Sequence, residues 1–152
     1  MDYIKYEPSV IGKNVKIGEG TVISSFVYIG DRTTIGKNCK IKPFCFIAED
    51  TIIGNNCFLA PGVKIYNDKK PPSKGKHWAI VVIGNNVSIG GGSLIAPGVW
   101  IADNSKIRIG SVVTRDVLGD YYRGEILENW SNRYWPLRKK PPKNIKRIGT
   151  RS

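Results

Sequence analysis

The chain has 152 residues, a length typical of one domain that can bury a core without disulfide bonds. It has no apolar run long enough to cross a membrane, and its start lacks a basic segment followed by an apolar block. The sequence therefore predicts neither a membrane span nor a secretory signal, and we expect a soluble, cytoplasmic protein. The net charge of +12 is uneven, because residues 129–152 hold eight basic and no acidic side chains.

An aliphatic residue occupies every sixth position from Ile11 to Ile65 and again from Ile83 to Val113. A period of six fits neither the 3.6 period of an α-helix nor simple strand alternation, and short periods of this kind indicate a parallel β-helix. Glycine often follows the aliphatic position, and a small or β-branched residue stands four positions after it. Each hexapeptide therefore predicts one short strand and one turn, with coil stacked upon coil. The repeated positions are Ile11, Ile17, Ile23, Ile29, Ile35, Ile41, Ile47, Ile53, Leu59, Ile65, Ile83, Ile89, Ile95, Ile101, Ile107 and Val113.

All three cysteines occupy the small-residue position of a repeat, where other repeats have Thr, Val or Ser. An odd number of cysteines argues against a closed disulfide framework. Cys39 and Cys57 are three hexapeptides apart and are predicted to stack on one face, whereas Cys45 falls on another. Buried free cysteine behaves as a small hydrophobe, so we expect all three to pack in the core and predict no metal site.

From Ile11 to Leu118 the repeat resembles that of the hexapeptide-repeat acyltransferase family. The resemblance implies an all-β fold, a left-handed parallel β-helix with about three hexapeptides per coil. It also implies acetyl-CoA as the acyl donor and a homotrimer with an acyl-CoA cleft between subunits. We expect a β-helix domain over residues 1–118 with a loop at 66–82. Residues 119–152 would form a C-terminal cap with a short helix and a basic tail.

The repeat is interrupted only between Ile65 and Ile83. Pro71 and Pro72 cannot supply paired strands, which favours a projecting loop over one distorted coil. The segments Asn67–Lys69, Pro71–Ser73 and Lys76–Trp78 resemble the loop of nucleotide-sugar N-acetyltransferases, such as those acting on UDP-2-acetamido-3-amino-2,3-dideoxy-glucuronate. This likeness implies acetyl transfer to the amine of a nucleotide-linked 3-amino sugar.

The loop contains the predicted catalytic residues Asn67 and His77. His77 is the only histidine of the chain and the natural candidate for a general base; the alternative is that it braces the loop beside Trp78. A sugar amine should have a pKa of about 7.7 to 8.0, so hydrogen-bond acceptors would suffice to orient it without a strong base. Trp78 is expected to pack more than to stack on substrate. The predicted substrate-binding residues are Asn67, Asp68, Lys76, His77 and Trp78.

The acyl donor is expected along the second block of repeats. Gly91 and Gly92 leave room for a pantetheine arm and offer backbone N–H groups. Residues 109–116 resemble the last coil of the family, which implies that Arg115 contacts a CoA phosphate, although a solvated surface charge is the alternative. After Val117 the sequence departs from the family, so the adenine contacts stay open. The other predicted CoA-binding residues are Ile109, Gly110 and Thr114.

The basic tail admits two interpretations. Tyr134 and Trp135 among arginines and lysines suit nucleic acid or an anionic surface, but we favour a solvated tail that attracts anionic CoA and sugar nucleotide. Two alternatives to the N-acetyltransferase stay open: a non-catalytic β-helix that serves assembly or binding, and an O-acetyltransferase, which would need a base more. A three-histidine zinc carbonic anhydrase is excluded because the chain has one histidine.

Overall fold

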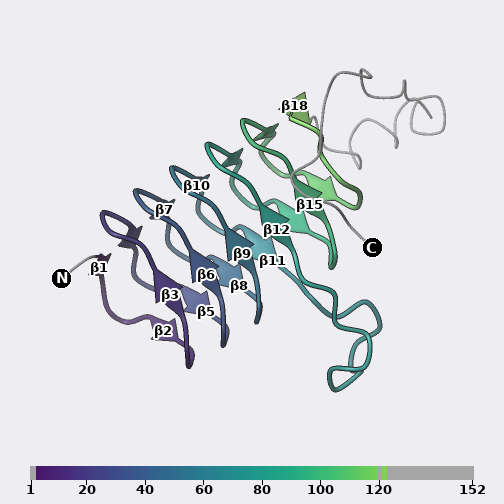
Figure 1. Cartoon of the computed structure of the whole chain (residues 1–152), viewed down its shortest axis with the longest axis horizontal. Helices are drawn as coiled ribbons and strands as arrows, with labels where there is room; N and C mark the ends of the chain where they lie inside the picture. The colour runs from purple at the N-terminus through teal and green to yellow at the C-terminus, as the bar shows by residue number, and fades with distance from the viewer. Residues whose placement is uncertain (1–2, 120, 123–152) are drawn as a thin grey trace.

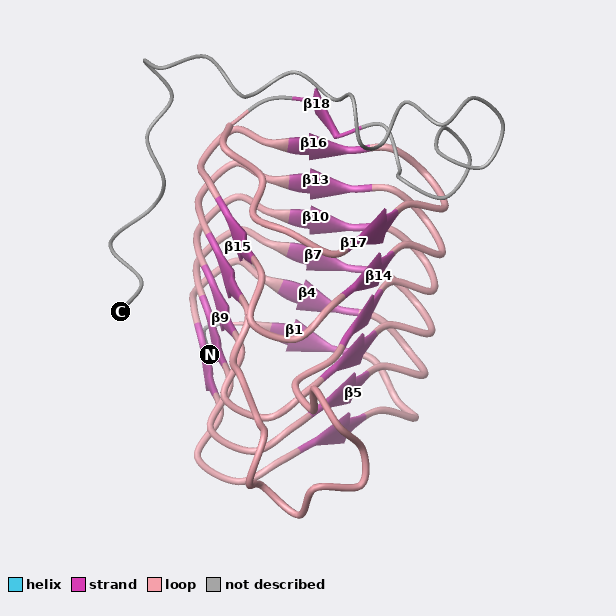
Figure 2. Cartoon of the chain, turned by 90° about the vertical axis from the view of Figure 1, so that its right-hand side faces the viewer, coloured by secondary structure: helices cyan, strands magenta, loops and turns pink. Residues whose placement is uncertain are grey.

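The computed structural model describes residues 3–119 and 121–122, and within these residues every regular element is a very short strand. The strands are parallel and form three sheets of seven, six and five strands, which wrap around one core (Figure 2). This is the parallel β-helix that the six-residue period predicts, and it is consistent with the left-handed winding that the resemblance implies. No helix within the described residues could cross a membrane.

From β1 to β17 the chain visits the three sheets in turn, so that each sheet collects every third strand, and β18 then joins the seven-stranded sheet beside β16. The seven-stranded sheet contains β1 (Ile4–Lys5), β4 (Val22–Ile23), β7 (Lys40–Ile41), β10 (Phe58–Leu59), β13 (Ser88–Ile89), β16 (Lys106–Ile107) and β18 (Tyr121–Tyr122). The six-stranded sheet contains β2 (Val10–Ile11), β5 (Tyr28–Ile29), β8 (Phe46–Ile47), β11 (Lys64–Ile65), β14 (Leu94–Ile95) and β17 (Val112–Val113). The five-stranded sheet contains β3 (Lys16–Ile17), β6 (Thr34–Ile35), β9 (Ile52–Ile53), β12 (Val82–Ile83) and β15 (Trp100–Ile101).

The register explains the core. Ile23 pairs with Ile41 and Ile41 with Leu59, so like positions of successive coils lie directly above one another. From β2 to β17 the second residue of each strand points inward, and the aliphatic positions therefore form three columns along the core. The largest fully buried side chains are Ile23, Ile29, Ile35, Ile41, Ile47, Ile53, Leu59, Ile65, Ile83, Ile89, Ile95 and Ile101.

Two corners of the prism flank the six-stranded sheet. The stack corner joins the seven-stranded to the six-stranded sheet and includes Phe26, Phe44 and Gly62. The loop corner joins the six-stranded to the five-stranded sheet. The turn residue with positive φ at the stack corner is Phe26 or Phe44 in two coils and glycine in the next three. Left-handed backbone is strained for a bulky residue, so these phenylalanines stand out in a repeat that elsewhere mostly uses Asn or Gly.

The interruption of the repeat is a loop, as predicted. Phe58 pairs with Lys40, three hexapeptides earlier, but with Ser88, five hexapeptides later. The segment therefore adds the length of two hexapeptides to an otherwise ordinary step from β11 to β12. Residues 66–81 project from the loop corner, away from the stacked coils (Figure 1). The legs pair as an antiparallel ribbon in which Asp68 lies opposite Trp78.

The solenoid extends one strand beyond Leu118. In β18 Tyr122 pairs with Ile107, half a hexapeptide short of a full coil, and occupies the inward column with 4% exposure. Its hydroxyl donates to the carbonyl of Val112 at 3.0 Å. Tyr122 therefore closes part of this end of the core. The predicted short helix and the basic tail lie outside the described residues.

Candidate functional site

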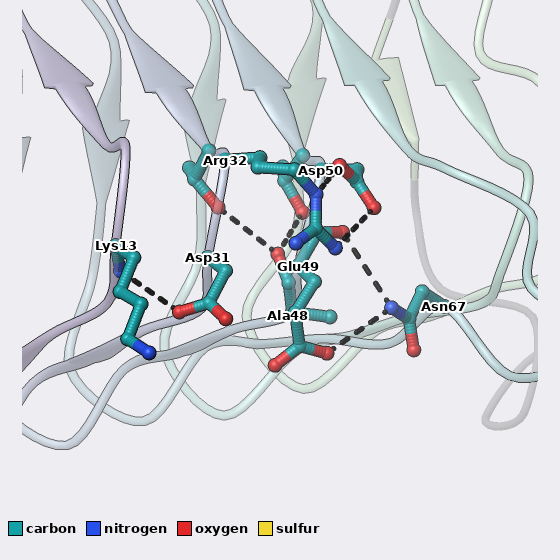
Figure 3. Close-up of polar contacts among 9 residues, drawn as sticks. Lys13, Asp31, Arg32, Ala48, Glu49, Asp50 and Asn67 are labelled. Carbon is teal, nitrogen blue, oxygen red and sulfur yellow. Dashed lines mark hydrogen bonds and ion pairs between the residues drawn. The ribbon is translucent and has the colours of Figure 1, made fainter. Parts of the chain in front are cut away.

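A polar ladder runs along the loop corner. Lys13, Asp31, Glu49 and Asn67 follow one another at the coil spacing, one from each successive coil (Figure 3). The Lys13 N–H donates to Asp31 Oδ1 at 2.8 Å. The step from Asp31 to Glu49 needs glycine at position 30, because a Cβ at Gly30 would lie 2.5 Å from the Glu49 nitrogen and 2.8 Å from Glu49 Oε2. The corner thus brings polar side chains from distant sequence to the base of the loop.

The last step of this ladder joins Glu49 to Asn67. Asn67, which is 8% exposed, directs its Nδ2 group to Glu49 Oε1 at 3.3 Å and to the Glu49 carbonyl at 3.5 Å. Its own carbonyl accepts the Ala79 N–H at 2.7 Å, which closes the base of the loop. With Nδ2 turned to Glu49, the Oδ1 of Asn67 points away from the carboxylate (Figure 3). The pair therefore brings a carboxylate and an amide oxygen together at the base of the loop.

Tyr28 completes the surroundings of the carboxylate. Its hydroxyl donates to Glu49 Oε2 at 3.3 Å, while its ring stacks on Phe46 with centroids 5.0 Å apart. Burial first, and then the negative charge of Glu49, raise the pKa of Tyr28. The phenol therefore stays protonated at neutral pH and holds one carboxylate oxygen in place.

Asp68 organises the loop. Its carboxylate accepts the Ser73 N–H at 2.9 Å, the Ser73 hydroxyl at 2.7 Å and the Lys70 N–H at 3.0 Å. Desolvation would raise the pKa of Asp68, but the hydrogen bonds from Ser73, Lys70 and the Trp78 side chain together outweigh it, and the pKa is lowered. The Ser73 hydroxyl also accepts the His77 N–H at 3.1 Å. Asp68 was predicted to bind substrate, but in the structure its carboxylate accepts hydrogen bonds from within the loop.

His77 lies farther out along the loop. The Lys69 N–H donates to the His77 carbonyl at 3.1 Å, so His77 stands two residues beyond the level at which Asn67 faces Ala79. The His77 and Lys76 side chains are exposed, and Trp78 is 41% exposed. The structure thus separates the two predicted catalytic residues: Asn67 is buried at the base of the loop, and His77 is exposed on the projecting ribbon.

The predicted CoA-binding residues fall at two corners. Gly91, Gly92, Ile109 and Gly110 lie at the stack corner, where the Gly110 N–H donates to the Gly91 carbonyl at 2.9 Å. Cβ atoms built at Gly92 and Gly110 would meet nothing within 4 Å, so both glycines face open space. Thr114 and Arg115 lie across β17 at the loop corner, and the Arg115 guanidinium lies 6.0 Å from the ring centroid of Tyr122.

The cysteines are buried and free, and they lie in the core as predicted. The Cys57 N–H points to Cys39 Sγ at 3.5 Å, in agreement with their predicted stacking. Among the described residues no group of three or more His, Cys, Asp or Glu side chains could hold a metal ion.

The sequence alone did not single out Glu49 or Tyr28. The signal was present, because Glu49 precedes Asn67 by the length of one coil. Coil spacing applied to each loop residue would have found Glu49. Tyr28 reaches Glu49 from the neighbouring strand, and its contact depends on the side-chain direction that only the structure gives.

Comparison with known families gives two matches. Residues 8–36 and 32–67 match a family described as "Bacterial transferase hexapeptide (six repeats)". Residues 80–115 match one described as "Hexapeptide repeat of succinyl-transferase". Together these matches cover more than half of the chain and both blocks of the repeat.

Three individual proteins are similar over different lengths. A 37-residue stretch, 24% of this chain and 18% of the other, is 57% identical to the galactoside O-acetyltransferase of Escherichia coli (strain K12). The acetyltransferase domain of PglB from Neisseria gonorrhoeae FA1090, in complex with acetyl coenzyme A, superposes with a TM-score of 0.67 at 13% identity, over 78% of this chain and 53% of the other. A mutant of AntD, an N-acyltransferase from Bacillus cereus in complex with dTDP and coenzyme A, superposes with a TM-score of 0.62 at 15% identity, over 99% and 84%. The chain thus spans about half or less of the first two relatives, and the two structures share its fold.

Proposed function

This chain belongs to the hexapeptide-repeat acyltransferase family, and on that premise we propose that it transfers the acetyl group of acetyl-CoA to the amine of a nucleotide-linked amino sugar. The observation that carries this proposal is the Glu49–Asn67 pair at the base of the loop. A carboxylate and an amide oxygen offer acceptors to the N–H groups of an amine.

The reaction is a simple exchange of bonds. The amine nitrogen attacks the thioester carbonyl, a C–N bond forms, and the C–S bond then breaks. The proton lost by the amine is taken up by the departing thiolate, which leaves as CoA–SH. Glu49 and the Oδ1 of Asn67 hold the amine with its lone pair toward the thioester, and such positioning supplies much of the rate in an acyl transfer.

The acceptor pair does not have to be a strong base. An amine with a pKa of about 7.7 to 8.0 is partly neutral at pH 7, and keeping it neutral costs about 1 kcal/mol. A carboxylate within hydrogen-bonding distance is then sufficient to orient it. An amine is therefore favoured over a sugar hydroxyl as the acceptor group.

The acyl donor and the assembly follow from the same premise. We place CoA along the later coils, with Gly92 and Gly110 at the open stack corner and Arg115 on a phosphate. The loop of one subunit, with His77, Lys76 and Trp78 exposed on it, would reach a neighbouring subunit of a homotrimer. AntD, which shares the fold, is an N-acyltransferase observed with dTDP and coenzyme A, and this precedent motivates a nucleotide-linked acceptor.

A second candidate function is O-acetyl transfer to a sugar hydroxyl. The 57% identity to the galactoside O-acetyltransferase over 37 residues favours it. A hydroxyl loses its proton far less readily than an amine, so this reaction would depend on a general base, and His77 would have to supply it.

The test is a thiol-release assay with acetyl-CoA against UDP- and dTDP-linked 3-amino and 4-amino sugars. Sedimentation velocity of the same sample measures its oligomeric state. We expect turnover with one of these amines and a trimer in solution. Absence of turnover across the panel, together with absence of CoA binding, would contradict the proposal and favour a non-catalytic β-helix.

A further inference from the structure

Two phenylalanine rings stack at the stack corner. Phe26 and Phe44 lie one coil apart, with ring centroids 5.3 Å apart and planes inclined by 8°. Both occupy left-handed turn positions, with φ values of 62° and 69°, and their side chains are 55% and 60% exposed. Two large apolar side chains are thus held at strained turn positions and presented to solvent, which calls for an explanation.

The aromatic stack ends at Phe44, because the following turn positions in the same column are glycines. The next residue in this column is Gly62, followed by Gly92 and Gly110, all with positive φ. A Cβ at Gly62 would meet only Gly92, at 3.7 Å, and Cβ atoms at Gly92 and Gly110 would meet nothing within 4 Å. Because Gly62 has no side chain, no side chain from the next turn of this column covers the ring face of Phe44 that is turned away from Phe26.

A cation lies beside this space. The Lys64 ammonium donates to the Phe44 carbonyl at 2.7 Å and to the Gly62 carbonyl at 3.2 Å. These two bonds hold the ammonium next to the end of the stack, and an ammonium has three donors. The third can serve an anion at the same place.

We propose that the stack corner binds a nucleoside diphosphate, with its base stacked on Phe44 above Gly62 and a phosphate on Lys64. Bases stack on aromatic side chains without requiring specific hydrogen bonds, and lysine binds phosphate as a point charge. The components are tied together by the Lys64 ammonium, which contacts the carbonyls of both Phe44 and Gly62.

The site is aligned with the acceptor pair. Gly62, Lys64 and Asn67 belong to one coil and cross the six-stranded sheet from the stack corner to the loop corner. Five residues of extended chain cover about 17 Å, so the base site and the Glu49–Asn67 pair lie within about that distance. A sugar nucleotide bound in this order directs its sugar toward Glu49; this orientation of the substrate rests on the proposed function, whereas the nucleotide site does not.

Two molecules carry this chemistry: the sugar nucleotide and CoA itself, which contains an adenosine diphosphate. Isothermal titration of the full chain with UDP, dTDP, ADP and CoA separates them. Preference for UDP or dTDP assigns the site to the acceptor substrate, and preference for ADP and CoA assigns it to the donor. Failure of all four to bind at millimolar concentration overturns the inference.

Variants test the position. Asparagine occupies the left-handed turns at Asn14, Asn38 and Asn56, so Phe44→Asn removes the ring at little cost to the backbone. It should weaken binding about tenfold or more, as expected for a lost stacking partner. The matched control Phe26→Asn removes the other ring and leaves the binding face intact, so it should change affinity less than about threefold. Equal effects of the two variants, or no effect of Phe44→Asn, would overturn the proposal.

Two further variants separate ring from phosphate. Lys64→Gln should weaken UDP binding about tenfold while leaving uridine binding unchanged, and it should reduce the salt dependence. Gly62→Asn keeps the ring but fills the space beside it, and it should also weaken binding about tenfold or more. Because these titrations need no turnover, binding without catalysis would contradict only the proposed function. Turnover with a KM that does not respond to Phe44→Asn would contradict only this inference.

Discussion

The Nδ2 group of Asn67 lies 3.3 Å from the Glu49 carboxylate, across one coil of the solenoid. The two residues are three hexapeptides apart, so the repeat itself sets their separation. One stands in an ordinary turn and the other at the first turn of the loop, which ties the loop to the rigid prism. A reactive group held on a regular scaffold keeps its geometry better than one on a free loop.

Glu49→Gln should lower kcat/KM for the amine acceptor about ten- to a hundredfold, the cost of losing one charge-assisted hydrogen bond. The glutamine keeps the shape but presents an N–H₂ group to the substrate amine or to Asn67. Because Glu49 is only half-buried, the midpoint of thermal unfolding, Tm, should change little in this variant. The matched control is Glu19→Gln, an exposed carboxylate at the third corner of the prism. Equal activity of the two variants would contradict the role of Glu49.

His77→Ala should reduce kcat less than about tenfold, because the imidazole is exposed and stands beyond the level of Asn67 on the loop ribbon. A general base normally contributes about 10²- to 10⁴-fold. Steady-state kinetics across pH 6 to 9 measures the effect, with Lys76→Ala as an exposed neighbour for comparison. A loss of 10²-fold or more would assign the base to His77 and favour the O-acetyl reaction.

Ile53→Ala should lower the free energy of unfolding by about 2 to 5 kcal/mol, because Ile53 is 1% exposed in an inward column. Ile52→Ala, one residue earlier in the same strand, should cost less than about 1 kcal/mol, because Ile52 points outward and is 41% exposed. Urea unfolding of both variants makes the comparison. Similar losses would contradict the inward–outward alternation of β9.

Cys45 should make stability depend on alkaline pH. Burial raises the pKa of the Cys45 thiol to about 11, above the about 8.5 of an unfolded chain. The contribution of the protonated thiol to the free energy of unfolding is therefore complete below about pH 8.5. It is lost as the pH rises toward 11, because the unfolded chain releases the proton first. Cys45 stands between Val27 and Val63 in its column, so Cys45→Val is a conservative control. Urea unfolding at pH 7, 9 and 10 should show a shallower decline for the variant.

The fold could be predicted closely from the sequence because one physical rule generates it. Ile23, Ile41 and Leu59 recur at the coil spacing, and each must be buried, so the columns follow from the period alone. The loop followed from Pro71 and Pro72, which cannot join a ladder. The last strand did not follow, because Tyr122 enters its column half a hexapeptide early and is out of phase with the repeat.

The candidate site was less predictable. Asn67 and Asp68 are consecutive in sequence, yet one side chain turns to Glu49 and the other into the loop. Residues 67 and 68 lie in an irregular turn outside the repeat, so the six-residue period does not predict the direction of their side chains. The predicted CoA residues also showed this limit: Gly110 and Thr114 are close in sequence, but β17 separates them onto two corners of the prism.

The most direct test of the central claim compares two sugar nucleotides that differ only in an amino or a hydroxyl group at the same sugar carbon, each with acetyl-CoA in a thiol-release assay. We expect kcat/KM to be at least a hundredfold higher for the amine, and we expect Glu49→Gln to remove most of this activity. Equal or greater turnover of the hydroxyl compound, insensitive to Glu49→Gln, would contradict it.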